Sequence, residues 1–248
     1  MRSIEIVSHC YSEQHPVFAS LLTSQLSSLW LWPPEKCRVL VVICTTTSDK
    51  LTRAVGASFA DLFAGGPVDV QVRLYEKSHL FRRAIARNFA AKMTTSDIVW
   101  FADADYLFGQ GCLDNLAAYD ITGLSYPRQV LIHKSHRAGD VEISRIVPGE
   151  VFEPDLTLFQ PQRVKFAIGG LQIVPGAVAR EKGYLDHSKW IKPVDPAKGF
   201  QDTREDKSYR AEFKAQSVGL NLPRLMRFRH SQSAFEDAEK RLAQTEGK

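Results

Sequence analysis

The first hundred residues alternate between strand-like and helix-like segments, and this alternation limits the fold more than any other feature of the sequence. Strands are predicted for four apolar segments, at residues 4–8, 38–44, 68–75 and 98–102. Helices are predicted between them, from Pro16 to just before Trp32, from Lys50 to Phe63 and from Leu80 to Met93. Successive β-α units of this length favour a mostly parallel sheet with right-handed crossovers and helices on both faces. The sequence therefore predicts a doubly wound, Rossmann-like α/β fold.

Length and composition indicate one globular domain over residues 1–248. Hydrophobic residues make up 44% of the chain and charged residues 24%, which excludes the disordered and fibrous classes. After about Asp120 the regular alternation gives way to strand-like pieces at 124–133 and 166–174, set in long polar loops. A charged helix is expected at the end, within residues 231–248.

The net charge of +4 is too small and too dispersed to indicate nucleic-acid binding. The densest basic cluster, residues 224–229, could hold an anionic substrate, rest on an anionic membrane surface or simply be solvated. No apolar run approaches the roughly 20 residues of a membrane helix. The four cysteines match no zinc pattern, so buried free thiols are expected. These features favour a cytoplasmic protein and leave open peripheral contact with the inner membrane face.

Two carboxylates follow directly on the predicted strand 98–102, at Asp103 and Asp105. Residues two apart in an extended chain point the same way, so both can face one ligand. Hard oxygen donors at this spacing suit Mg²⁺ or Mn²⁺ bound together with substrate phosphates. The alternative is a pair that caps a turn. In open α/β sheets, however, ligands bind beyond the carboxyl ends of the strands, so the loops after Ser8, Cys44 and Ala102 should gather around one ligand.

The helix predicted before this strand carries two arginines and an asparagine. Its apolar pattern predicts a buried stripe with Asn88 inside it, made of Phe81, Ala84, Ile85, Phe89 and Met93. Arg83 and Arg87 lie four residues apart on another flank, where they could bind phosphate or contact a nucleobase. The alternative is an ordinary amphipathic helix with solvated arginines and a core asparagine.

Residues 83–91 (RAIARNFAA) and 97–105 (DIVWFADAD) together resemble the A-A-R-N-x-G and I-x-F-L-D-x-D signature of GT-A glycosyltransferases, especially glycosyltransferase family 2. Residues 169–174 and 181–186 resemble the G-G and G-G-Y-D-E segments of that family. Residues 199–202 and 205–210 resemble its E-D motif and the arginine that follows. The similarity extends from the first strand to about Gly219.

The resemblance implies a GT-A fold, with a nucleotide-sugar-binding half at about 1–120 and an acceptor-binding half at about 121–230. It implies a nucleoside-diphosphate-sugar donor, with UDP as the commonest nucleotide, and Mn²⁺ or Mg²⁺ bridging Asp103, Asp105 and the diphosphate. His230 resembles the late histidine that adds a metal ligand in several such enzymes, with a surface histidine as the alternative, and His9 and His79 are weaker candidates. The implied donor-binding residues are Ser8, Cys10, Tyr11, Thr45, Thr46, Arg83, Arg87, Asn88, Asp103, Ala104 and Asp105.

The resemblance also implies a carboxylate that takes the proton of the attacking hydroxyl. Asp206 is the first candidate for this base, Asp202 the second, and Glu205 stands beside Asp206. Glu205 and Asp206 could equally form the charged first turn of a helix capped by Asp202 or Thr203. The implied acceptor contacts are Gly169, Gly170 and Gln172, and the acceptor is a hydroxyl of a glycan, a lipid-linked molecule or a small molecule. In-line attack would invert the anomeric configuration.

Two departures from the family pattern bear on the nucleobase. The first strand is followed by residues 8–12 (SHCYS) in place of a Pro-Thr-Tyr-Asn turn, and the second strand by residues 45–48 (TTTS) in place of an acidic pair. Three rival functions stay open at this stage. They are a retaining GT-A transferase of the mannosylglycerate synthase or polypeptide N-acetylgalactosaminyltransferase kind, a sugar nucleotidyltransferase, and an inactive sugar-nucleotide- or glycan-binding module.

Overall fold

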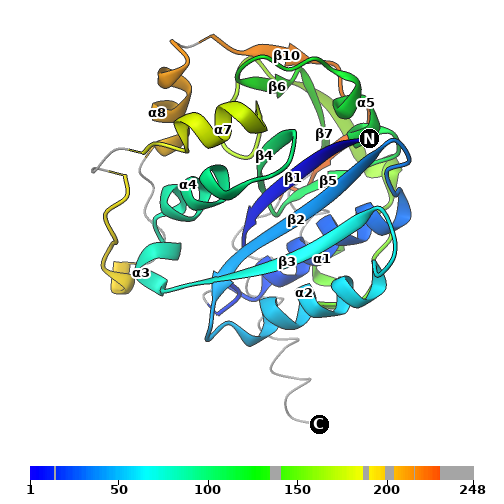
Figure 1. Cartoon of the computed structure of the whole chain (residues 1–248). Helices are drawn as coiled ribbons and strands as arrows, with labels where there is room; N and C mark the ends of the chain where they lie inside the picture. The colour runs from blue at the N-terminus through cyan, green and yellow to red at the C-terminus, as the bar shows by residue number, and fades with distance from the viewer. Residues whose placement is uncertain (14, 135–140, 187–189, 199–203, 215, 230–248) are drawn as a thin grey trace.

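A seven-stranded mixed sheet runs through the centre of the computed structural model, which describes residues 1–13, 15–134, 141–186, 190–198, 204–214 and 216–229 (Figure 1). The strand order is β10-β6-β9-β4-β1-β2-β3, in which β3, β2, β1 and β4 are parallel and β9 is antiparallel to both β4 and β6. The strands are β1 (Arg2–His9), β2 (Cys37–Thr46), β3 (Val68–Tyr75), β4 (Ile98–Asp103), β6 (Ser125–Pro127), β9 (Gln172–Pro175) and β10 (Val218–Leu220).

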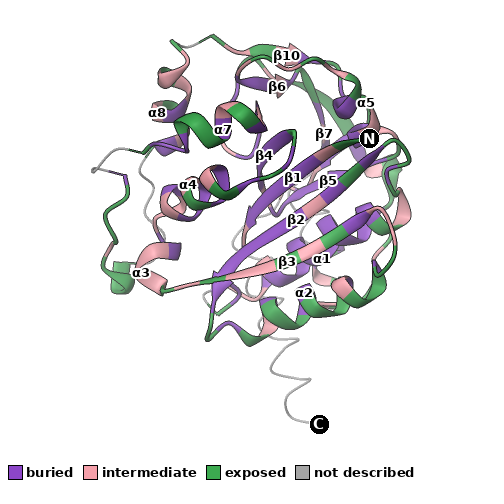
Figure 2. Cartoon of the chain, in the orientation of Figure 1, coloured by how far each residue is buried: buried purple, intermediate pink, exposed green. Residues whose placement is uncertain are grey.

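Helices cover both faces of this sheet, and each face has its own apolar core (Figure 2). One core includes Leu26 of α1, Phe59 of α2 and Leu116 of α5. The other includes Ala84 of α4 and Ala179 of α7. The helices are α1 (Val17–Leu31), α2 (Lys50–Leu62), α3 (Lys77–Leu80), α4 (Arg83–Met93), α5 (Cys112–Ala118), α7 (Gly176–Lys182) and α8 (Glu205–Glu212). The predicted α/β fold, with a mostly parallel sheet covered on both faces, is confirmed.

A second, four-stranded sheet packs beside the first in the order β5-β11-β7-β8. Its strands are β5 (Tyr106–Phe108), β7 (Gln129–His133), β8 (Phe159–Arg163) and β11 (Leu225–Arg227), and two short 3₁₀ helices are η1 (Leu156–Leu158) and η2 (Pro196–Lys198). The strand-like piece predicted at 124–133 forms two short strands, because the chain leaves the main sheet after Pro127 and enters the second sheet at Gln129. The strand predicted at 166–174 is reduced to β9, because Gly169 has a φ of +50° and Leu171 N–H closes a turn on Ile168.

The helix predicted at 80–93 is α4, which begins at Arg83 after the short α3, and its predicted buried stripe is correct only in part: Phe81 and Ala84 are buried as predicted. Phe89 and Met93 are 50% and 58% exposed, whereas Arg87 is 1% exposed. The buried positions of α4 are Ala84, Ala86, Arg87, Ala90 and Ala91. Small alanine side chains let a helix lie close to the sheet and its neighbours, and apolar periodicity gives them little weight. The exposed Phe89 packs its ring edge against Tyr75 of β3 instead.

All four cysteines are free and buried, as expected: Cys10, Cys37, Cys44 and Cys112. Among the helices in the described ranges, none combines the length and the apolar character needed to cross a membrane.

Candidate active site

The carboxyl end of β4 places Asp103 and Asp105 at the edge of the main sheet. Asp103 is the last residue of β4 and lies opposite His9 of β1 in the strand register. Ala104 and Asp105 form the turn into β5, and both are buried. The side chain of Asp103 remains 28% exposed. The pair thus lies where the parallel strands end, as the sequence predicts.

Two arginines from α4 converge on the Asp103 carboxylate. The Arg87 guanidinium donates to Asp103 Oδ1 at 3.2 Å, and an Arg83 nitrogen lies 3.6 Å from the same oxygen. Burial raises the pKa of Asp103, but the charges of Arg83, Arg87 and Arg227 outweigh it and leave that pKa below its ordinary value. Asp103 is therefore an ionised carboxylate held by cations.

Arg87 is the most buried charge of the site, and a chain of polar contacts supports it. Its guanidinium donates to the Tyr184 hydroxyl at 3.0 Å and lies over the Tyr184 ring at 5.3 Å. The Tyr184 hydroxyl donates to Gln172 Oε1 at 2.9 Å, and Gln172 Nε2 donates to the Asp206 carbonyl at 3.0 Å. This chain links the arginine on α4 to the first turn of α8.

Asp105 has a separate arginine partner that sequence reasoning missed. Arg227 Nε on β11 donates to Asp105 Oδ2 at 2.8 Å, and its guanidinium lies over the Tyr106 ring. Arg227 pairs with Tyr106 in the antiparallel register of β11 and β5, and this pairing brings Arg227 next to Asp105, which lies 122 positions earlier in the chain. The basic cluster 224–229 is visible in the sequence, but nothing there indicates which carboxylate it meets.

The first turn of α8 brings two more carboxylates to the site. Glu205 is buried, and its Oε1 lies 3.1 Å from Arg83 Nε in an ion pair. Asp206 Oδ2 accepts from the backbone N–H of Gly169 at 3.2 Å. The residue at the N-cap of α8 is Arg204, and the alternative caps Asp202 and Thr203 lie outside the described residues. Asp202 and His230, two of the predicted site residues, lie outside the described residues.

Gly169 and Gly170 let the loop before β9 approach Asp103 closely. A side-chain Cβ at Gly170 would lie 2.5 Å from Asp103 N and 2.7 Å from Tyr106 Cε2. A Cβ at Gly169 would lie 3.5 Å from Asp103 Oδ2, and the φ of Gly169 is +50°. Because neither glycine carries a side chain, this loop contacts Asp103 closely on one side, while Gly169 N–H donates to Asp206 on the other.

The loops after β1 and β2 are tied together by Asp49, the N-cap of α2. Its carboxylate accepts from Ser12 N at 2.7 Å, from Thr45 Oγ1 at 3.2 Å and from Thr52 N at 3.0 Å. The Ser8 hydroxyl donates to Gln25 Oε1 at 2.8 Å. The predicted donor-binding residues Ser8, Cys10, Thr45 and Thr46 are buried here, and the hydroxyls of Ser8 and Thr45 are bonded within the protein.

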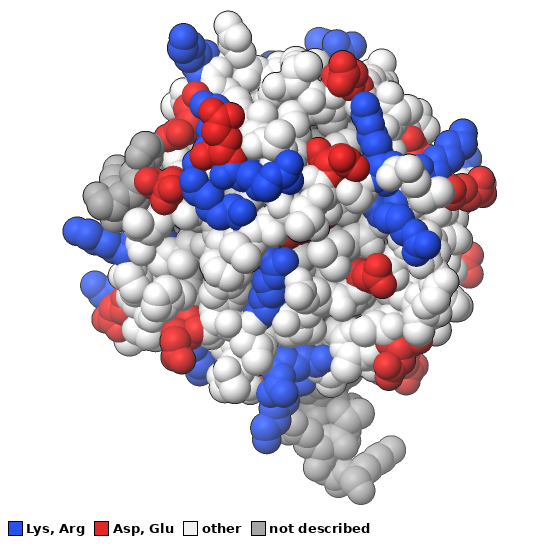
Figure 3. Space-filling model, in the orientation of Figure 1, with Lys and Arg blue, Asp and Glu red and all other residues white. Residues whose placement is uncertain are grey.

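Two more residues are predicted to bind donor: Asn88 lies on α4, and Tyr11 packs against Phe81 just before that helix. The Tyr11 ring packs against Phe81 at 4.9 Å, with Lys77 Nζ 5.4 Å from its centroid. Asn88 is half-buried, and its Oδ1 accepts from Tyr184 N at 2.9 Å. Asn88 thereby positions the tyrosine that supports Arg87. Acidic and basic side chains gather side by side over α4, α7 and α8 on the face shown in Figure 3.

His9 brings a neutral imidazole to the same strand edge. Both ring nitrogens are buried and make no hydrogen bond within the part of the chain that the structure describes. Burial, together with the charges of Arg87 and Arg83, holds the pKa of His9 well below its ordinary value. The edge therefore offers one uncharged, unpaired ring beside the arginine–carboxylate cluster.

The comparisons with known proteins concern the fold and the family. The family model described as Glycosyl transferase family 2 matches residues 8–126. A mannosyltransferase from Pyrobaculum calidifontis, solved in complex with GDP-Man and Mn²⁺, superposes with a TM-score of 0.54 at 14% identity. TarS residues 1–349 from S. aureus superpose with a TM-score of 0.52 at 15% identity. The chain therefore has the GT-A fold, and its residues 8–126 are similar to glycosyltransferase family 2.

The GT-A protein spans only part of those two chains. The two superpositions include 97% and 98% of this chain, but only 61% of the mannosyltransferase chain and 64% of the TarS chain. No curated protein matches it. The matched segment 8–126 includes Arg83, Arg87, Asp103 and Asp105 and ends before the glycine loop and α8.

Proposed function

We propose that the protein is a metal-dependent glycosyltransferase that moves a sugar from a nucleoside-diphosphate sugar to an acceptor hydroxyl. The observation that carries this proposal is the cluster at the end of β4, where Arg83, Arg87 and Arg227 meet Asp103 and Asp105. Guanidinium groups bind phosphate oxygens in a forked geometry. Carboxylates suit a divalent cation. A diphosphate and its metal need both kinds of group at one point.

The donor set fits Mn²⁺ or Mg²⁺. Asp103 and Asp105 supply hard oxygen atoms, and no group of three or more His, Cys, Asp or Glu side chains suited to a metal occurs among the residues that the structure describes. The remaining ligands would come from the diphosphate, from water and from His230. When bound, the metal neutralises charge on the departing diphosphate. The Mn²⁺ and GDP-Man in the Pyrobaculum calidifontis structure support this choice of ligands.

Asp206 serves as the base in this proposal. Its carboxylate is partly accessible and is oriented by one backbone N–H, from Gly169. Glu205, its neighbour, is buried against Arg83 and is committed to positioning that arginine. A carboxylate within reach of the acceptor hydroxyl takes its proton as the glycosidic bond forms. In-line attack from this side inverts the anomeric configuration.

The experiment is a transfer assay with a panel of UDP- and GDP-sugars, Mn²⁺ and glycan, lipid-linked and small-molecule acceptors. The wild type forms a product, and the NMR coupling of its anomeric proton shows inversion. Asp206→Asn lowers turnover about 100-fold or more, as loss of a general base does, while nucleotide binding by calorimetry stays within twofold of the wild type. Asp195→Asn, which removes a carboxylate near η2, is the matched control and keeps full turnover. Full turnover in Asp206→Asn would refute the assignment of the base, and retention of configuration would refute in-line attack.

A further inference from the structure

A second polar hollow lies at the opposite end of β11 from the candidate active site. Its volume is about 850 Å³. Leu225, which lines it, pairs with Phe108, whereas Arg227 pairs with Tyr106 next to Asp105. The hollow is lined by α5, by the turn between β6 and β7, by β7 and β8, and by β11 with the segment that leads into it.

Of the residues that the structure describes, three arginines line this hollow and no acidic residue does. Within the described ranges, Arg128, Arg163 and Arg224 form no salt bridge. Arg224 donates to the neutral Gln110 Oε1 at 2.7 Å. Three positive charges are thus held around one space without protein anions. At the active site, by contrast, Arg83, Arg87 and Arg227 each contact a carboxylate.

The backbone fixes the positions of these arginines. Arg128 N–H donates to Leu220 O and Arg128 O accepts from Val164 N–H, both at 2.8 Å. Gln129 pairs with Arg163 in the β7–β8 register. A Cβ at Gly219 would lie 2.6 Å from Arg128 Cγ and 2.7 Å from its Nε, so the glycine makes room for the arginine stem. The cationic wall is therefore a defined part of the fold.

The rest of the lining is apolar or an uncharged donor. Leu222 and Leu225 are buried beneath the hollow, and Leu131 is half-buried. Asn115, Gln129 and Asn221 add carboxamide groups. Ligand pockets typically enclose about 300–1,000 Å³, with apolar walls and a few polar anchors. Forked guanidinium groups prefer phosphate oxygens.

We propose that this hollow binds a phosphate-bearing ligand with an apolar portion, at a site separate from Asp103 and Asp105. The arginines contact the phosphate and the leucines contact the apolar portion. The same chemistry belongs to a soluble organic phosphate and to a phospholipid headgroup. This site stands on its own geometry and does not depend on the proposed transferase activity.

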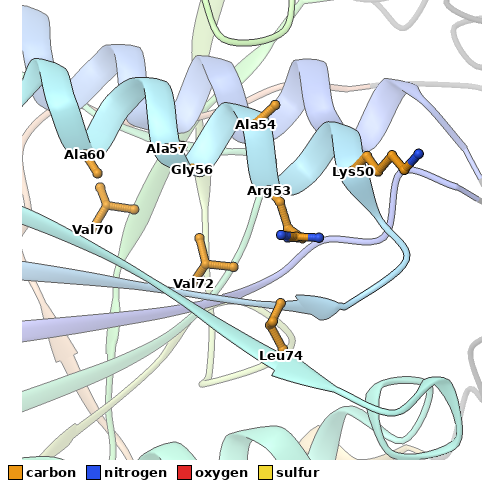
Figure 4. Close-up of a pocket in the computed structure, with 9 residues that line it drawn as sticks. All are labelled: Lys50, Arg53, Ala54, Gly56, Ala57, Ala60, Val70, Val72 and Leu74. Atoms are coloured by element: carbon orange, nitrogen blue, oxygen red, sulfur yellow. The ribbon is translucent and has the colours of Figure 1, made fainter.

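A contrasting hollow between α2 and β3 supplies the control (Figure 4). Its volume is about 650 Å³ and its walls are mainly small apolar side chains, with Lys50 and Arg53 at one end. Arg53 already donates to the Thr47 carbonyl at 2.9 Å. A Lys50→Gln/Arg53→Gln double variant removes two positive charges from the hollow between α2 and β3, and it serves as the matched control for Arg128→Gln/Arg163→Gln.

The experiment measures binding in EDTA, so that no divalent metal supports binding at Asp103. Calorimetry is carried out with inorganic pyrophosphate and with glycerol 3-phosphate, and cosedimentation with vesicles of phosphatidylglycerol or phosphatidylcholine. Arg128→Gln/Arg163→Gln weakens binding of the anionic probes at least 10-fold. Lys50→Gln/Arg53→Gln and Asp105→Asn bind as the wild type does. Circular dichroism checks that each variant is folded.

Binding of phosphatidylglycerol vesicles but not phosphatidylcholine vesicles, lost with the two arginines, supports the proposal with a lipid headgroup as the source. Binding of glycerol 3-phosphate without vesicle binding supports it with a soluble ligand. The proposal is overturned if the wild type binds none of the anionic probes. It is also overturned if Arg128→Gln/Arg163→Gln binds them normally, or if Asp105→Asn abolishes the binding.

Discussion

The two halves of the chain contribute different parts of the candidate active site. The β-α units before residue 120 place Asp103 and Asp105 at a strand end and Arg83 and Arg87 on the preceding helix. The later half supplies what fixes those groups, including Arg227, Glu205, Tyr184 and the glycine loop. The early half thus carries the carboxylates and arginines that we propose to face the ligand, while the later half controls their position and charge balance. We therefore expect substitutions in the later half to affect the site by displacing Asp103 and Arg87.

The largest effect that tests this comparison is expected from Arg87→Met. The variant leaves the Asp103 carboxylate and the Tyr184 hydroxyl without their buried partner, so we expect it to lower the free energy of unfolding by about 3 kcal/mol. Urea denaturation measures this change. Arg53→Met, at an exposed position on α2, is the control and should cost less than about 1 kcal/mol. Equal losses in the two variants would contradict the central role given to Arg87.

A smaller effect is expected from Gly170→Ala in the later half. The new methyl group would meet Asp103 N and the Tyr106 ring at under 3 Å, and overpacking of this kind costs about 1–3 kcal/mol. Nucleotide affinity should fall as well, because Asp103 must shift. Gly123→Ala, where a Cβ meets nothing within 4 Å, should leave both stability and affinity unchanged. An unaffected Gly170→Ala would show that the loop does not fix Asp103.

The smallest effect concerns acid stability. The pKa of Asp103 in the folded protein is below its ordinary value of 3.8, so its ionised form stabilises the fold above that value. This contribution is lost as the pH falls through the lowered folded pKa. The stability difference between the wild type and Asp103→Asn should therefore be constant above about pH 5 and should shrink below pH 3.8. A difference that is independent of pH from 2 to 7 would show that Asp103 gains nothing from its arginines.

The early half could be predicted well because the apolar pattern of consecutive residues indicates each strand and helix of a β-α unit. The strands ending at His9, Thr46 and Asp103 follow from continuous apolar runs, and the helix before β4 follows from its composition. The orientation of that helix could not be predicted from periodicity. Its buried face is made of alanines and one arginine, and the buried Arg87 donates a hydrogen bond to the hydroxyl of Tyr184, 97 positions later.

The later half was harder to predict, because its contacts are not local. Arg227 reaches Asp105 across 122 positions, and Asp206 meets Gly169 across 37. β6 and β7 are consecutive in sequence yet join different sheets. The resemblance in residues 169–174 and 205–210 located the right segments, but the pairing of Glu205 with Arg83 and of Asp206 with Gly169 required the structure. The roles of the predicted site residues in binding and catalysis stay predictions.

The central claim is that Asp105 and Asp103 hold a divalent metal together with a nucleoside diphosphate. It is tested most directly by calorimetry of UDP and GDP binding, with Mn²⁺ and with EDTA, to the wild type and Asp105→Asn. Asp97 directly precedes β4, at the opposite end of that strand from Asp103, and Asp97→Asn is the control. We predict that the wild type binds one of the nucleotides at least 10-fold more tightly with Mn²⁺, that Asp97→Asn does the same, and that folded Asp105→Asn loses the metal effect. Equal binding with and without Mn²⁺ in the wild type, or an intact metal effect in Asp105→Asn, would contradict the account.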